Sequence, residues 1–162
     1  FTKSCMNANE SLMYYYINYI LKEILPASEF SNYYIFPQVS IYSFIKVHSS
    51  LEQDESEYAS RNYWAKSIDF VICYCHKADR QYLYTPVLLM ELDGSSHFSS
   101  AKYGTKTFRR QQENDRFKDS LFSDLNIPLI RFQIPDNHLT RKDLPRLRLL
   151  LSKYFPWQSQ NK

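Results

Sequence analysis

Residues 87–97 place several chemically capable side chains directly after a run of apolar residues. Four apolar residues, 87–90, precede Glu91, Asp93, Gly94 and His97. An apolar run of this length, bounded by turn residues, predicts a strand that is buried on both faces. Side chains two positions apart on a strand point the same way, so Glu91 and Asp93 should share a face. Two desolvated carboxylates repel each other unless a cation lies beside them, and the segment therefore predicts a divalent metal site.

A second acidic strand is expected over residues 67–75, where Asp69 is the only charge in a β-prone run. The residues that follow, 76–84, are expected to connect this strand to the one that carries Glu91 as a hairpin. Pairing within that hairpin would bring Asp69 beside Glu91. A lone Asp on a strand is also typical of a solvent-exposed edge, and this alternative remains open.

The elements that would position these acids follow from hydrophobic periodicity and from turn residues. We expect a helix over 7–24, a strand over 33–44 bent at Pro37, a polar loop or short helix over 48–60, the two acidic strands, a loop over 95–107, a helix over 108–125, a strand over 129–133 and a helix over 141–154. This order is typical of an α/β fold. We expect a mixed sheet of four or five strands with helices on both faces.

Composition indicates a folded globular chain. With 162 residues, 17% aromatic and 23% charged, the sequence predicts one domain over 1–162, with its core over about 9–133. No segment is apolar enough to predict membrane insertion, and no signal peptide is indicated. The net charge of +3 permits a phosphate-bearing partner without requiring one. The chain begins with Phe, which leaves open that it is part of a longer protein. Assembly into a homo-oligomer is a separate possibility that the sequence leaves open.

Cysteine usage indicates a reducing, cytoplasmic setting. The three cysteines cannot form a disulfide framework. A zinc site made from Cys73, Cys75, His76 and His97 is an alternative, but the usual spacing between paired cysteine ligands is two to four residues, and here it is one.

The ensemble of motifs resembles the PD-(D/E)XK nuclease superfamily. The likeness is greatest to the branch that includes very-short-patch-repair-like endonucleases and several uncharacterised bacterial domain families. It extends from about Asn9 to Phe132. It rests on Phe36-Pro37-Gln38-Val39, Arg61-Asn62-Tyr63-Trp64 through Ile68-Asp69-Phe70, Glu91-x-Asp93-Gly94-x-x-His97, Asp115-x-x-Lys118, and Ile127-Pro128-Leu129-Ile130-Arg131-Phe132.

The resemblance implies a restriction endonuclease-like core and metal-dependent hydrolysis of phosphodiester bonds, with DNA preferred over RNA as the nucleic acid. Asp69 and Glu91, with the backbone carbonyl of Leu92, would hold Mg²⁺ or Mn²⁺. The superfamily usually has Lys at the position of Asp93, so Asp93 would ligate a second ion or orient water, and Lys118 would supply the missing positive charge.

Two further candidates each have a structural alternative. Glu10 matches a Glu on the first helix of the superfamily, yet it follows Asn7 by three residues, the spacing of a capping box. His97 lies four residues after Asp93, where it could ligate a metal or assist a leaving group, although a loop histidine is often only a surface residue.

The helix over 108–125 carries the expected nucleic-acid contacts. Gln111, Asp115 and Lys118 lie at i, i+4 and i+7, on one helix face that could also be merely solvated. A cationic rim for phosphates is expected from Lys102, Lys106, Arg109, Arg110 and Arg116. The function expected is therefore that of an Mg²⁺-dependent deoxyribonuclease that acts within strands as an endonuclease. The alternatives are a degenerate module that binds nucleic acid or a protein without cleaving, and an interaction domain with no nucleic-acid role.

Overall fold

A mixed sheet forms the centre of the molecule. The computed structural model describes residues 6–45, 66–94, 100–134 and 137–155. Within these residues the strands lie in the order β1 (Tyr33–Ser40), β2 (Ser67–Ala78), β3 (Gln81–Gly94) and β4 (Leu129–Ile134). The first three strands are antiparallel to their neighbours, and β4 is parallel to β3. The expected α/β class with a mixed four-stranded sheet is confirmed.

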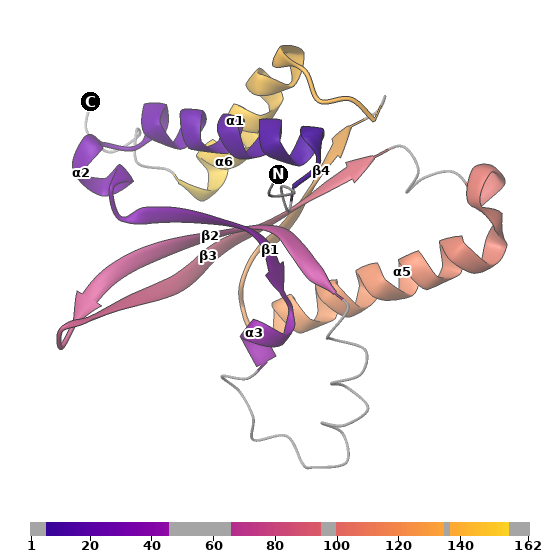
Figure 1. The fold of residues 1–162 in the computed structure, drawn as a ribbon, viewed down its shortest axis with the longest axis horizontal. Coiled ribbons are helices and arrows are strands. Elements are labelled where there is room, and N and C mark those ends of the chain that lie inside the picture. The colour runs from indigo at the N-terminus through magenta and orange to yellow at the C-terminus, as the bar shows by residue number, and fades with distance from the viewer. Residues whose placement is uncertain (1–5, 46–65, 95–99, 135–136, 156–162) are drawn as a thin grey trace, which may run out of the picture.

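Helices cover both faces of this sheet (Figure 1). The first face is covered by α1 (Ala8–Ile24) and α6 (Leu144–Tyr154), and the second by α3 (Tyr42–Ile45) and α5 (Ser100–Asp124). Alternation along β2 divides its side chains between two hydrophobic clusters. Phe70 and Ile72 pack in the cluster with α1 and α6, whereas Val71 and Cys73 pack in the cluster with Phe44 and Phe122. The second face, the α5 face, is the one that carries the acids.

The β2–β3 hairpin is longer than the sequence indicated. Residues 76–84 were expected to form a connection, but both strands continue to a two-residue turn at Asp79 and Arg80. Both turn residues have positive φ, 47° and 72°. Such a turn matches the right-handed twist of paired strands, so it lets the ladder run to the tip.

The expected strand over 33–44 is wrong in its second part. β1 ends at Ser40, and the chain then forms the short helix α3. The cause is packing, because this turn buries Ile41 completely and sets the Phe44 ring edge-on against Phe122 of α5, with 5.3 Å between ring centroids.

The expected loop over 95–107 is also wrong beyond residue 99, because α5 begins at Ser100. The parallel pairing of β3 with β4 requires the chain to return along the whole strand, and a long helix makes that crossover.

The remaining elements are short or close to expectation. α2 (Ala27–Phe30) follows Pro26 and was not expected. The C-terminal helix begins as a 3₁₀ turn, η3 (Arg141–Asp143), capped by Thr140, and continues as α6. The segment over 48–60 lies outside the described residues. In the part of the chain that is described, no helix is both long and apolar enough to cross a membrane.

Candidate functional site

Asp69 and Glu91 lie on neighbouring strands. The register pairs Phe70 with Met90 and Val71 with Leu89, which sets Asp69 opposite Glu91. Both side chains face α5, because they alternate with Phe70 and Met90 of the opposite core. Glu91 and Asp93 are buried, and Asp69 is half-buried. The hairpin therefore brings together the two carboxylates that the sequence predicted to be neighbours.

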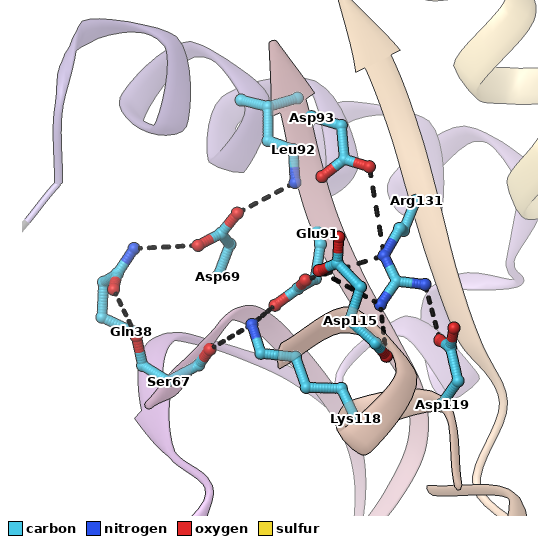
Figure 2. Close-up of polar contacts among 10 residues, drawn as sticks. All are labelled: Gln38, Ser67, Asp69, Glu91, Leu92, Asp93, Asp115, Lys118, Asp119 and Arg131. Atoms are coloured by element: carbon cyan, nitrogen blue, oxygen red, sulfur yellow. Dashed lines mark hydrogen bonds and ion pairs between the residues drawn. The ribbon is translucent and has the colours of Figure 1, made fainter. Parts of the chain in front are cut away.

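The Asp69 carboxylate is held by hydrogen bonds from two other strands (Figure 2). The Leu92 backbone N–H donates to Oδ2 over 2.9 Å, and the Gln38 side-chain amide donates to Oδ1 over 3.3 Å. Ser67 Oγ in turn donates to Gln38 Oε1 over 3.0 Å. Gln38 has φ 52°, which is uncommon for a residue other than glycine. This backbone conformation accompanies a side chain aimed at the acid.

Lys118 of α5 connects the two acidic strands. Its Nζ donates to Glu91 Oε1 on β3 and to the Ser67 backbone carbonyl on β2, the latter over 3.0 Å. The Lys118 side chain is only 14% exposed, so the ammonium is fixed between the strands. A positive charge from the helix therefore lies directly on the buried carboxylate.

Arg131 of β4 lies among four carboxylates (Figure 2). Its Nη1 donates to Asp119 Oδ1 over 2.5 Å, and its Nη2 lies 3.7 Å from Asp115 Oδ1. Its Nε lies 3.9 Å from Glu91 Oε2 and 4.0 Å from Asp93 Oδ2, and within the described residues this buried nitrogen has no hydrogen-bond acceptor. Arg131 thus joins the acids of β3 to those of α5.

The acid cluster, which we define as Asp69, Glu91, Asp93, Asp115 and Asp119, outnumbers its two cations, Lys118 and Arg131. Burial is the largest influence on the pKa of Glu91 and raises it, and the nearby Asp69 carboxylate raises it further. Lys118 and Arg131 lower this pKa, but the net result is a raised pKa. Burial lowers the pKa of Arg131, but Asp119, Asp115 and Glu91 outweigh it and raise the pKa. The net negative charge would repel a phosphate and attract a divalent cation.

The donor set fits a hard cation with few protein ligands. Within the described ranges, no three His, Cys, Asp or Glu side chains lie close enough together to form a ready-made metal cluster. Mg²⁺ usually keeps several waters and binds through one or two carboxylates together with substrate phosphates. Asp69 and Glu91 would provide those two carboxylates, with the backbone of Leu92 beside them.

Comparison with known proteins gives a family but no activity. A family model described as a protein of unknown function, DUF2726, matches residues 2–145. The chain belongs to the DUF2726 family. Searches of curated proteins and of solved structures gave no significant match. The matched range of this DUF2726 chain contains all four strands and the acid cluster.

Of the predicted site residues in this DUF2726 chain, six lie together: Asp69, Glu91, Leu92, Asp93, Asp115 and Lys118. Asp115 faces Arg131 rather than standing free on the helix surface. Leu92, predicted to ligate through its carbonyl, contacts Asp69 through its N–H.

Glu10 is used locally. Its carboxylate accepts hydrogen bonds from the backbone N–H and the side-chain amide of Asn7, over 2.9 and 2.6 Å, in a complete capping box. Among the described contacts none joins it to the acid cluster, so a catalytic role for Glu10 stays a prediction.

Some of the other predicted residues belong to the described part of the chain, and some do not. Arg109 and Arg116 are exposed on α5, and Gln111 is half-buried. His97 lies outside the described residues, and so do the side chains of Lys102, Lys106 and Arg110. The cationic rim is therefore located only in part.

Two residues that complete the site, Gln38 and Ser67, were not assigned from the sequence, whereas Arg131 was expected to pair with one of the acids. Gln38 and Ser67 support Asp69 and Lys118, and Arg131 balances the acids. The signals were modest: Gln38 follows a proline inside a strand, and Arg131 is a charge within the apolar strand β4.

Proposed function

We propose that this chain is an Mg²⁺- or Mn²⁺-dependent nuclease that hydrolyses phosphodiester bonds in DNA, on a restriction endonuclease-like core of the PD-(D/E)XK superfamily. The observation that carries the proposal is the contact of Lys118 with Glu91 beside Asp69. Two carboxylates on paired strands and one ammonium from α5 are the groups that such a hydrolysis needs. A cytoplasmic location belongs to the proposal, since Cys73 and Cys75 are free and buried.

In this proposal Asp69, Glu91 and the Leu92 carbonyl hold the ion, which supplies Lewis-acid charge for the phosphate and for an attacking water. Lys118 Nζ donates to the phosphate oxygen on which charge develops. Asp93 orients water, and Arg131 keeps the surrounding acids balanced. His97 assists the leaving group, and the exposed Arg109 and Arg116 contact flanking phosphates.

A second candidate is a module that binds nucleic acid or a protein partner without cleaving. Asp93 stands where the superfamily usually has Lys, and Lys118 and Arg131 already neutralise Glu91. A buried carboxylate that has cationic partners of its own can persist without a metal, which favours this alternative.

Cleavage of plasmid and linear DNA separates the two candidates. The wild type is expected to cleave with Mg²⁺ or Mn²⁺ and not with a chelator, and Asp69→Asn and Glu91→Gln should be inactive. Asp124→Asn and Glu113→Gln are matched controls, because both acids are exposed on α5. A wild type that binds DNA but leaves it intact under every metal condition supports the binding module. Activity that persists in Glu91→Gln contradicts the proposed site.

A further inference from the structure

Three aromatic side chains outside the acid cluster lie exposed on the α5 face of the sheet. Tyr34 and Phe36 of β1 are 43% and 37% exposed, and Tyr84 of β3 is 46% exposed. We call these three the aromatic platform. The strand register places them toward the hairpin end of the sheet, where β2 and β3 extend past α5 (Figure 1). A contiguous exposed apolar patch on a folded domain commonly marks a binding surface.

The rings of the aromatic platform hold one another in place. Tyr84 packs edge-on against Tyr34 and against Phe36, with centroid distances of 5.3 and 5.4 Å and interplanar angles of 89° and 87°. Tyr34 and Phe36 are nearly parallel to each other, at 20°. The platform is thus arranged before any ligand binds, which reduces the entropy lost on stacking.

A cavity of about 520 Å³ adjoins the platform and is lined in part by Phe36, Tyr84 and Cys73. This volume is within the range of small-molecule pockets, about 300–1,000 Å³. Burial raises the pKa of the Cys73 thiol to about 11, so the thiol is neutral at pH 7. An uncharged, mostly apolar lining suits a flat neutral ring.

The aromatic platform is continuous with the proposed catalytic site. Tyr34, Phe36 and Gln38 alternate along β1, and Gln38 donates to Asp69. Four residues of strand span about 13 Å, so a strand lying over these rings would reach the acids within a few nucleotides. Lys77 and Arg80 are exposed near the hairpin tip, and within residues 76–84 of the described hairpin Asp79 is the one acid, so they offer positive charge to a phosphate backbone.

We propose that the aromatic platform stacks the bases of an unpaired DNA strand and leads its backbone to the acid cluster. The proposal rests on the proposed nuclease function, and it specifies the substrate as single-stranded or frayed DNA. Bases stack on aromatic rings with little dependence on sequence, because every base has a π-face. Paired bases are stacked within the duplex and cannot offer that face, so these rings should add little to the affinity for a duplex.

Binding is measured by fluorescence anisotropy in the presence of a chelator, so that hydrolysis does not interfere. The probes are a labelled single strand of about 16 nucleotides, the upper site size of small strand-binding domains, and the matching duplex. Tyr34→Ala/Tyr84→Ala removes two rings, and Tyr34→Phe/Tyr84→Phe keeps them. Tyr15→Ala/Tyr19→Ala is the matched control, because these exposed, stacked tyrosines lie on α1, across the sheet. Circular dichroism verifies that each variant is folded.

Tyr34→Ala/Tyr84→Ala is expected to weaken single-strand binding about tenfold or more and duplex binding far less. The Phe variant and the α1 control should bind like the wild type. Equal binding by the wild type and the double Ala variant would overturn the proposal, as would equal losses on single strand and duplex. Self-association in ultracentrifugation that the double Ala variant abolishes, with DNA binding unchanged, would assign the surface to a second copy of the chain instead. Cleavage is scored separately, so a platform that binds without hydrolysis contradicts only the nuclease function.

Discussion

Replacing Lys118 by Ala should weaken the metal-free fold and slow cleavage, while leaving metal binding intact or tighter. Lys118 is 14% exposed and donates to Glu91 and to the Ser67 carbonyl. Removing one partner of a buried ion pair typically destabilises by about 3–5 kcal/mol. We expect a smaller loss, about 2–3 kcal/mol, because Arg131 Nε remains 3.9 Å from Glu91 Oε2. Lys118→Met, which retains most of the aliphatic stem, separates lost packing from lost charge.

The assay is thermal unfolding with and without Mg²⁺, followed by single-turnover cleavage. A loss of 2–3 kcal/mol corresponds to a decrease in Tm of about 4–12 °C in a chain of this size. Mg²⁺ at about 100 times its Kd should restore about 2.7 kcal/mol, because an ion that binds only the folded chain shifts the unfolding equilibrium by mass action. Cleavage should fall by about two to three orders of magnitude, as when one transition-state donor is removed. The exposed Lys153 of α6 gives the control Lys153→Ala. A Lys118→Ala variant that melts and cleaves like Lys153→Ala refutes this reasoning.

Further variants test the other parts of the site and the core. Glu91→Gln should end cleavage. Burial raises the pKa of Glu91 in the folded chain. The stability that Glu91 contributes is therefore full below its ordinary pKa of 4.5 and is lost as pH rises through the raised pKa. Metal-free denaturant titrations should therefore show the wild type losing stability relative to Glu91→Gln over that window, and a trend of opposite sign would make Glu91 chiefly a structural partner of Arg131. Glu10→Gln should change stability by no more than about 1 kcal/mol and cleavage by less than tenfold; a loss as complete as that of Glu91→Gln would give Glu10 a catalytic role. Phe122→Ala should destabilise the fold by about 3–5 kcal/mol in urea titrations, and a loss under 1 kcal/mol would show that Phe44 and Phe122 do not anchor α5.

Local patterns in the sequence predicted those parts of the fold that depend on neighbouring residues. The helical spacing of Met13, Ile17 and Ile20 predicts α1, and all three are buried. The period of two along the strand predicts that Glu91 and Asp93 share a face of β3, and the hairpin sets Asp69 of β2 opposite Glu91 as predicted.

Features that depend on contacts between residues far apart in the sequence could not be predicted from local patterns. Arg131 meets Asp115 and Asp119 only because α5 crosses beside β4, and no spacing within β4 indicates this. The conformation of Gln38 depends on its reach toward Asp69 on the next strand. α5 begins earlier than predicted because the chain must return along β3 before β4 can pair parallel to it. No local pattern in the sequence indicates this parallel pairing.

Metal binding at Asp69 and Glu91 is the central claim, and isothermal titration calorimetry of Mn²⁺ and Mg²⁺ tests it most directly. The titration compares the metal-free wild type with Asp69→Asn, using Asp124→Asn as the control. Because the Glu91 pKa is raised by burial, affinity in the wild type should also fall as pH decreases through that pKa. The account predicts saturable binding in the wild type and in Asp124→Asn, and its loss in Asp69→Asn. Equal affinity in the wild type and in Asp69→Asn would contradict it.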